Sequence, residues 1–341
     1  MLSPTNKKLF RTILINSVIS GVLTAVFMYL IFYQGPESIF AGFCIGLTVY
    51  LGIAGYERSI EYRYFQKLNL ILLLLLTTIA HAIIILLSAI LFVGIFYMQG
   101  HFELYFSEDS ILLSRAFLVG LAYGLILSMI FSFLNIVSRI IGKNILVKLF
   151  IGKYSKPSEE DRIFMFLDLT SSTTIAENIG HLKYLSLLND FFHDIVEPID
   201  QTRGEIYKYV GDEVIITWKT KEGISNHNCL ACFQLIENKI KDKSDAYMKK
   251  FGLVPEFKAG LHGGISVIGE IGYFRREIAF VGDVLNTASR IMGECKTFNR
   301  SMLISEDIVK QLAPIAEYNL EEVGTVMLRG KGKEIKLYSV I

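Results

Sequence analysis

The sequence is poor in the residues that define several familiar classes of protein. Its four cysteines are too few and too scattered for a disulfide-linked fold. Cys229 and Cys232 form a single Cys-x-x-Cys pair, whereas a structural zinc site needs two more ligands at a fitting spacing, so we expect both to be buried in a helix. The net charge of +1 excludes the strong basic excess that holds nucleic acid, and we expect no nucleic-acid partner.

Long hydrophobic runs are what the sequence has instead. Hydrophobic residues make up 52% of the chain, and the excess lies in roughly the first 150 residues. Four runs there approach or exceed the length of about 20 residues that a helix needs to cross a bilayer. They are Leu9–Tyr33, Ser38–Tyr56, Leu68–Tyr97 and Ile111–Ile136. We therefore predict a four-helix transmembrane domain over residues 1–138, embedded in the lipid bilayer of the cell's inner or plasma membrane.

Charged residues between these runs indicate how the chain crosses the membrane. Lysine and arginine lie before the first run, between the second and third, and after the fourth: Lys7, Lys8, Arg11, Arg58, Arg63, Lys67, Arg139, Lys143 and Lys148. The other two connections carry mainly acids: Glu37, Glu103, Glu108 and Asp109. Because basic residues mark the cytoplasmic side, this pattern predicts a multi-pass protein with both termini in the cytoplasm.

Two features of this half leave its role open. His81 lies midway along the third run, where an ionisable residue is a functional candidate. We interpret it as a neutral histidine that is hydrogen-bonded inside the helix bundle. Residues 139–160 form a predicted helical connector, which Gly152 and Pro157 end. An unknown ligand sensed by the membrane domain, a dimerising role and a plain anchor all fit, and the connector is either a signal transmitter or a passive linker.

The polar half, residues 161–341, contains two acidic residues at the ends of expected strands. Asp168 follows the apolar run Ile163–Leu167, which reads as a buried strand, and a hydroxyl-rich turn comes next. Asp212 lies in a Gly-Asp pair between two β-rich runs, which is typical of a hairpin. A hairpin beside the first strand would bring the two carboxylates together. Two carboxylates with substrate phosphates are a usual way to hold Mg²⁺, although each signal alone also fits an ordinary helix cap or turn.

Two further segments offer groups for a phosphorylated ligand. Asn286 and Arg290 are four residues apart on an expected helix that starts near Val284, so they share one face. An amide beside a guanidinium can bind a ribose oxygen and a phosphate, or it can be simply a solvated surface. Lys331 lies in a basic, glycine-bearing turn before the expected last strand Ile335–Val340. Lys331 could contact a phosphate, or it could simply be a solvated surface residue that favours solubility.

Taken together, these segments resemble the class III adenylyl/guanylyl cyclase homology domain. The resemblance covers about Arg162 to the C-terminus and rests on Phe-x-Asp-Leu, Lys-x-x-Gly-Asp and Gly-Asp-Val-x-Asn-x-Ala-x-Arg, in that order. It implies an α+β ferredoxin-like catalytic domain that acts as a head-to-tail homodimer. The implied enzyme is a membrane-bound adenylate cyclase, which converts ATP to 3′,5′-cyclic AMP and pyrophosphate.

The resemblance also implies roles for single residues. Asp168, Asp212 and the carbonyl of Leu169 would bind two Mg²⁺ ions per site, with Mn²⁺ able to substitute. Asn286 would orient the ribose and Arg290 would stabilise the phosphoryl charge. Lys208 would bind the adenine, from the other subunit, and Lys331 would contact the terminal phosphates. From the residues themselves, we expect the hydroxyl-rich turn before the helix to bind phosphate as well, through Thr170, Ser171, Ser172 and Thr173.

One position departs from the family pattern. Adenylyl cyclases usually place Asp or Thr seven residues before the ribose-binding Asn, and this chain has Ala279 there. Guanylyl cyclases usually have Glu where this chain has Lys208, so Lys208 favours ATP. Three alternatives remain: a guanylate cyclase, a degenerate nucleotide-binding membrane receptor, and a diguanylate cyclase, whose signature loop resembles Gly211-Asp212-Glu213.

Overall fold

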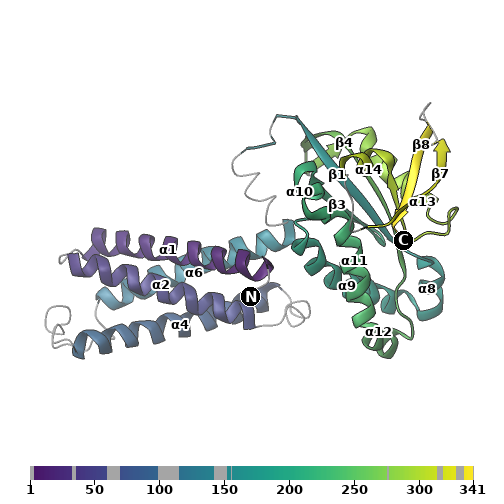
Figure 1. Ribbon diagram of the computed structural model, residues 1–341. Coiled ribbons are helices and arrows are strands. Elements are labelled where there is room, and N and C mark those ends of the chain that lie inside the picture. Colours follow the sequence, from purple (N-terminus) through teal and green to yellow (C-terminus); the bar gives the residue numbers. More distant parts are fainter. Residues whose placement is uncertain are drawn as a thin grey trace. The chain divides into compact units, whose positions relative to one another are not determined.

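The computed structural model describes residues 4–32, 36–59, 70–98, 115–141, 152–154, 156–274, 276–312, 318–327 and 334–340. The chain divides into two compact units, Met1–Val147 and Lys148–Ile341 (Figure 1). Each unit has its own elements and its own packing, and each is described by itself below.

The first unit is built from long apolar helices. They are α1 (Pro4–Phe32), α2 (Pro36–Ser59), α4 (Leu70–Met98) and α6 (Arg115–Ile141). Three contain a stretch long and apolar enough to cross a membrane: Phe10–Leu30, Ile39–Tyr56 and Leu75–Phe92. In α6 the apolar stretch among the residues whose side chains are described is Leu118–Leu134. The four expected helices are thus present, and within the described residues three of them meet the length criterion for a membrane span.

Burial in this unit is the reverse of that in a water-soluble bundle. Large apolar side chains lie on the outside, and Leu30, Leu87 and Ile126 are each at least 60% exposed. Small polar side chains lie inside, among them Ser17, Ser20, Thr77, Ser128 and Ser132. A surface of this kind is stable against lipid, because hydrocarbon does not penalise exposed leucine, and small interior residues let helices approach closely.

His81 lies in the interior of this unit, as the sequence indicated. Its side chain is 1% exposed, and its Nδ1 is 2.8 Å from the Oγ of Ser128 and 3.3 Å from that of Ser132. These contacts join α4 to α6 through polar groups. The interpretation of His81 as a hydrogen-bonded histidine inside the bundle is confirmed.

The second unit alternates strands and helices around one sheet. Its strands are β1 (Ser158–Leu169), β2 (Glu205–Val210), β3 (Glu213–Lys219), β4 (Phe257–Ile271), β5 (Glu277–Val281), β6 (Met302–Ser305), β7 (Leu320–Met327) and β8 (Glu334–Val340). Its helices are α8 (Ser172–Ile179), α9 (His181–Gln201), α10 (Thr220–Ile224), η2 (Ser225–His227), α11 (Asn228–Asp242), α12 (Ser244–Phe251), α13 (Asp283–Glu294) and α14 (Glu306–Leu312).

The strand order places the expected hairpin beside the first strand. The sheet runs β2-β3-β1-β4-β6-β8-β7, and β5 pairs with β4 outside this path. Strands β1 to β4 alone have the ferredoxin-like order, with antiparallel neighbours throughout. The parallel pairing of β4 with β6 makes the whole sheet mixed. The domain is therefore an α+β fold, as expected, and the β2–β3 hairpin meets β1 as predicted.

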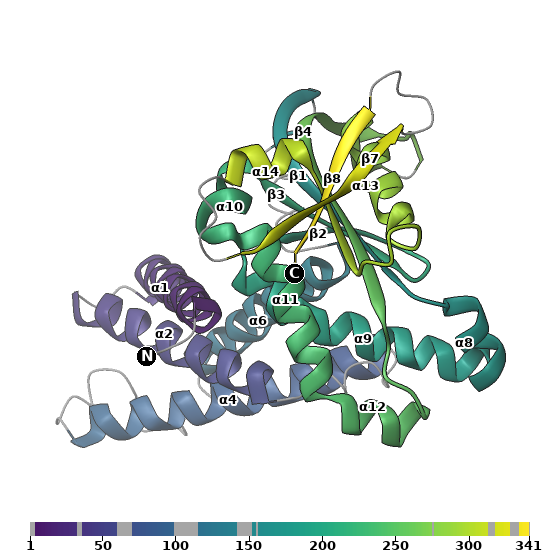
Figure 2. The ribbon, with the colours of Figure 1, turned by 45° about the vertical axis from the view of Figure 1, so that its right-hand side comes forward.

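Helices cover the two faces of the sheet unequally. Helices α9 and α11 lie together on one face (Figure 2), where Phe191, Ile195 and Phe233 are buried against β1 and β3. Helix α13 packs on the other face through Val284 and Ala288. Because β1 is covered on both faces, its centre reads as a continuous apolar run rather than an alternating one.

The Cys-x-x-Cys pair is part of the larger core. Cys229 and Cys232 lie on α11, and neither has any exposed surface. Burial raises the pKa of both thiols to about 12, so neither is a reactive thiolate at neutral pH. The prediction of buried helical cysteines is confirmed.

Candidate functional site

The two aspartates predicted to meet lie next to each other at one end of the sheet. Asp168 is the second-last residue of β1, and it pairs with Glu213 of β3 on one side and with Lys258 of β4 on the other. Asp212 immediately precedes Glu213 in the β2–β3 turn, where Gly211 has a φ of 64° that suits glycine. Strand pairing over a long sequence separation thus assembles the acidic cluster, defined here as Asp168, Asp212 and Glu213.

Electrostatics show that the acidic cluster has an excess of negative charge. The pKa of Asp168 is raised, first by burial and then by the charge of Asp212. The pKa of Glu213 is raised to about 7 by burial and by both aspartates. A bound cation would relieve this repulsion, and carboxylate oxygens suit Mg²⁺. No group of three or more His, Cys, Asp or Glu side chains with metal-binding geometry occurs in the described part of the chain, and Mg²⁺ needs only one or two carboxylates when phosphates supply the rest.

Lys258 is a residue of this site that the sequence reasoning missed. Its Nζ lies 3.3 Å from Oδ2 of Asp168, and it lowers the pKa of that carboxyl group against the effect of burial. The signal was present in the sequence, because Lys258 is the one charged residue in the otherwise small and apolar start of a strand, Phe257–Leu261. Only the pairing of β4 with β1 connects it to Asp168.

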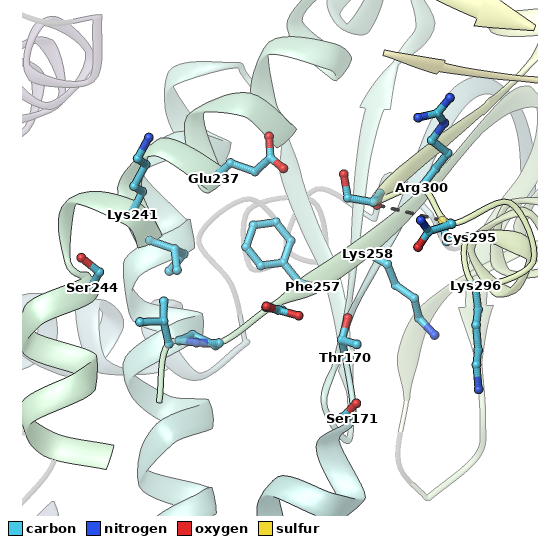
Figure 3. A pocket seen from close by; sticks show the side chains of 16 residues that line it. Thr170, Ser171, Glu237, Lys241, Ser244, Phe257, Lys258, Cys295, Lys296 and Arg300 are labelled. Carbon is cyan, nitrogen blue, oxygen red and sulfur yellow. Dashed lines mark hydrogen bonds between the residues drawn. The ribbon is translucent and has the colours of Figure 1, made fainter. Parts of the chain in front are cut away.

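The hydroxyl-rich turn after β1 borders an open cleft. Thr170 donates its backbone N–H to the carbonyl of Glu256 at 2.8 Å, and Ser171 has a φ of 57° directly before α8. Both residues line a cleft of about 790 Å³ together with Lys258, Lys296 and Arg300. Lys258 and Lys296 extend to the side where Ser171 lies, whereas Arg300 points away (Figure 3). The cleft therefore brings hydroxyl groups together with two lysine side chains, one of which, Lys258, contacts the acidic cluster.

The neighbouring residues Leu169, Ser172 and Thr173 are not among those that line the cleft. Leu169 ends β1, with its side chain buried in the core and its backbone paired with Phe257. Ser172 and Thr173 begin α8, and Ser172 lies within hydrogen-bonding reach of the phenol of Tyr184. The structure thus keeps Leu169 to Thr173 in one segment next to Asp168, as the sequence order required.

Helix α13 holds the predicted amide and guanidinium on its outer face. Val284 and Ala288 are buried against the sheet, whereas Asn286 is exposed and Arg290 is half-buried. In the described part of the chain neither residue makes a side-chain hydrogen bond or ion pair with the acidic cluster. Asp283 is the first residue of α13 rather than its cap, and Gly282 holds the capping position.

Lys208 lies on β2, away from the two aspartates. Its Nζ is 3.4 Å from both carboxylate oxygens of Glu277, the first residue of β5. Ala279 is buried two residues further along β5. Lys331 lies outside the described residues. A single chain thus brings together Asp168, Asp212 and the turn after β1, whereas Lys208 contacts Glu277, and no hydrogen bond or ion pair among the described residues connects Lys208, Asn286 or Arg290 to the two aspartates.

Comparisons with known proteins agree with this geometry. The family model for the adenylate and guanylate cyclase catalytic domain matches residues 154–341, which is more than half of the chain. Adenylate cyclase 2 of Rhizobium meliloti (strain 1021) is 34% identical over 220 residues, which cover 64% of this chain and 61% of that protein. An adenylate cyclase of Anabaena cylindrica is 28% identical over 180 residues, which cover 52% of this chain and 36% of that protein.

A solved structure extends the comparison to the fold. A bacterial light-regulated adenylyl cyclase superposes with a TM-score of 0.56 at 16% identity, over 69% of this chain and 66% of that one. At this identity the likeness concerns the fold alone. The chain spans less than two thirds of the length of the curated relatives named above. The family match assigns the Gly-Asp-Glu hairpin to class III cyclases rather than to diguanylate cyclases. The chain belongs to the class III adenylate and guanylate cyclase family.

Proposed function

We propose that this protein is a membrane-bound adenylate cyclase that converts ATP to 3′,5′-cyclic AMP and pyrophosphate at a homodimer interface. The observation that carries the proposal is the meeting of Asp168 and Asp212 beside Lys258 at one end of the sheet. In the reaction the ribose 3′-oxygen bonds to the α-phosphorus. The bond from that phosphorus to pyrophosphate breaks, and the hydroxyl proton is released to solvent.

The metal ions belong to the acidic cluster in this proposal. Asp168, Asp212 and the carbonyl of Leu169 would hold two Mg²⁺ ions per site, with Mn²⁺ as a substitute. When bound, such ions neutralise phosphate charge and favour in-line displacement at phosphorus. The raised pKa of Asp168, caused by burial and by Asp212, supports the fit, because a bound cation would favour the charged form of Asp168.

The other predicted residues position the substrate. Thr170, Ser171, Ser172 and Thr173 lie beside the terminal phosphates, and Lys258 neutralises them within the cleft next to Asp168. Lys331 is assigned to the same phosphates by the family pattern. Asn286 orients the ribose, and Arg290 stabilises the charge that the phosphoryl group gains.

A second copy of the chain supplies the missing half of the site in this proposal. Asn286 and Arg290 face outward from α13, so they suit a site on another molecule. Strand β4, β5 and their connection expose large apolar side chains, with Tyr273 87%, Phe274 100% and Ile265 66% exposed. Exposed apolar patches of this kind mark protein–protein contacts.

The membrane domain is assigned to residues 1–138 with four spans, followed by a connector over residues 139–160 and the catalytic domain over 161–341. Three helices with suitable apolar stretches and the exposed apolar surface of the first unit support this assignment. The basic residues flanking the helices support an orientation with both termini in the cytoplasm, where ATP and magnesium are available.

The test is a turnover assay on the full-length protein in lipid nanodiscs. ATP and GTP are supplied side by side with Mg²⁺ or Mn²⁺, and the products are identified by mass spectrometry. Cyclic AMP and pyrophosphate in equal amounts are the expected result. Cyclic GMP as the main product would identify a guanylate cyclase. No product from a folded dimer would identify a nucleotide-binding receptor.

A further inference from the structure

The position that usually helps to read adenine in this family is unable to do so here. Ala279 has no side-chain hydrogen-bonding group, and it is buried. Glu277 lies two residues earlier on β5, and residues two apart along a strand point to the same side. We propose that Glu277 replaces the missing group, so that Lys208 and Glu277 together recognise the base of ATP. This inference rests on the proposed function and names the residue that sets its nucleotide preference.

The contact between the two residues has the form of a donor–acceptor pair open to a ligand. Lys208 Nζ lies 3.4 Å from both Oε1 and Oε2 of Glu277, so the ammonium is shared between the two oxygens. The Lys208 side chain is 47% exposed and that of Glu277 is 44% exposed. Contacts of 3.4 Å are long for a charge-assisted bond, and both groups can therefore turn to a base without losing a strong interaction.

The backbone of β2 is shaped to aim Lys208 at β5. The pairing of β2 with β3 shifts register between Ile206 and Lys208, which marks a bulge at Tyr207. In a regular strand, Tyr207 and Lys208 would point to opposite faces. Here both side chains reach β5. Lys208 contacts Glu277, and the hydroxyl of Tyr207 accepts a hydrogen bond from the N–H of Phe280 at 3.2 Å. Bulges re-aim side chains in this way and are common beside active sites.

An aromatic cluster then fixes the distance between the two strands. The rings of Tyr207 and Phe280 meet edge to face at 5.0 Å, and Phe164 of β1 contacts Phe280 at 5.3 Å. The buried guanidinium of Arg162 lies 4.8 Å from the Phe280 ring. Since β2 and β5 are not neighbours in the sheet, this cluster is what holds Lys208 and Glu277 across from each other.

The chemistry of the pair matches adenine better than guanine. Adenine presents an acceptor at N1 and a donor at its 6-amino group, which suit an ammonium and a carboxylate side by side. Guanine presents a donor at N1 and an acceptor at O6, so the same placement would oppose donor to donor and acceptor to acceptor. Groups left without partners in a closed site disfavour binding strongly, and this mismatch would select ATP.

The test pairs a residue change with a substrate change in the full-length protein. Wild type and Glu277→Ala are assayed with ATP and with purine riboside triphosphate, which lacks the 6-amino group. We expect Glu277→Ala to lower kcat/KM for ATP about tenfold and to leave that for the purine analogue nearly unchanged. Glu277→Gln, whose amide can also donate to O6, should lower the ATP/GTP ratio of kcat/KM. Lys208→Glu should shift the ratio further toward GTP.

A matched control separates base recognition from loss of a surface ion pair. Glu322 pairs with Lys336 at 3.5 Å, with side-chain exposures of 46% and 48% that nearly equal those of the Lys208–Glu277 pair. Glu322→Ala should therefore leave the ratio between the two substrates unchanged. Equal losses for ATP and the purine analogue in Glu277→Ala would overturn the inference while leaving the cyclase activity standing. Inactive wild-type protein would instead overturn the proposed function.

Discussion

The acidic cluster and the outer face of α13 differ in how complete they are within one chain. Asp168 has its charged neighbours in place, with Asp212 beside it and Lys258 at 3.3 Å. Asn286 and Arg290 lie on a helix of the same domain but point outward, with their buried neighbours Val284 and Ala288 fixing that direction. In the proposed function one chain presents two half-sites, which would make the unit of function, a dimer, larger than the unit of folding.

The largest effect is expected from removing a carboxylate of the acidic cluster. Asp168→Ala should abolish turnover, by about 10³-fold or more, because it removes a metal ligand worth several kcal/mol in the transition state. Initial rates of cyclic AMP formation measure this. Asp161→Ala, at the exposed other end of β1, is the control and should remain active. An Asp168→Ala protein with normal rates and a normal melting temperature would contradict the assignment of the acidic cluster to the active site.

Mixing two inactive variants tests whether the half-sites belong to different copies. Asp168→Ala and Arg290→Ala are each expected to be inactive. After subunit exchange in equal amounts, half of the dimers are mixed and carry one intact site each, so about a quarter of the wild-type activity should return. Mixing Asp168→Ala with Asp212→Ala should restore nothing, because both changes hit the same half. Failure of the first mixture to regain activity, with exchange verified, would place both half-sites on one chain.

A smaller effect is expected from disturbing the helix that carries the second half-site. A Cβ added at Gly260 would lie 2.2 Å from the backbone N of Met292 and 2.5 Å from the carbonyl of Ala288, so α13 would have to move. Gly260→Ala should lower the free energy of unfolding by about 1–3 kcal/mol and should reduce turnover. Gly264→Ala is the matched control, because its Cβ meets nothing closer than 3.7 Å. Thermal unfolding and initial rates separate the two outcomes.

The smallest effect is expected at a charge remote from both half-sites. Burial alone would raise the pKa of Asp194, but hydrogen bonds from Lys243, His193 and Tyr247 outweigh it and lower that pKa. A lowered folded-state pKa stabilises the protein above the unfolded value, near 3.9, and the contribution is lost as pH falls through the folded value. Asp194→Asn should therefore cost about 1 kcal/mol at pH 7, discounted because Lys243 is partly exposed. The stability difference from wild type should shrink below about pH 4, and the ATP/GTP ratio should not change.

Much of the fold could be predicted because its signals are local. The long apolar runs of the first unit form helices, and the Gly211-Asp212 pair forms a hairpin turn. Both features depend on residues that are adjacent in the sequence. The fourth predicted run, Ile111–Ile136, begins outside the described residues, and within them its apolar part is Leu118–Leu134. The helix expected to start near Val284 begins one residue earlier, at Asp283, and Gly282 holds the capping position.

Some residues of the candidate site could also be predicted from the sequence, and others could not. Asp168 and Asp212 could be named from their positions at expected strand ends, and the structure brings them together. Lys258 and Glu277 could not be named, because their roles depend on which strands become neighbours. Lys258 stands out in the sequence only as the one charged residue in an apolar strand start, which does not name Asp168 as its partner. Glutamate is common on surfaces, and nothing within a few residues of Glu277 marks it as a partner of Lys208.

The amino-acid sequence by itself determined the membrane helices, the hairpin, the buried first strand and the acidic residues at strand ends, because hydrophobic period and turn chemistry act over short distances. Only the tertiary structure decided that Lys258 faces Asp168 and that Glu277 faces Lys208. Those contacts join segments 90 and 69 residues apart, and they follow from strand order, a bulge and an aromatic cluster. Long-range pairing of this kind is set by the packing of the whole domain.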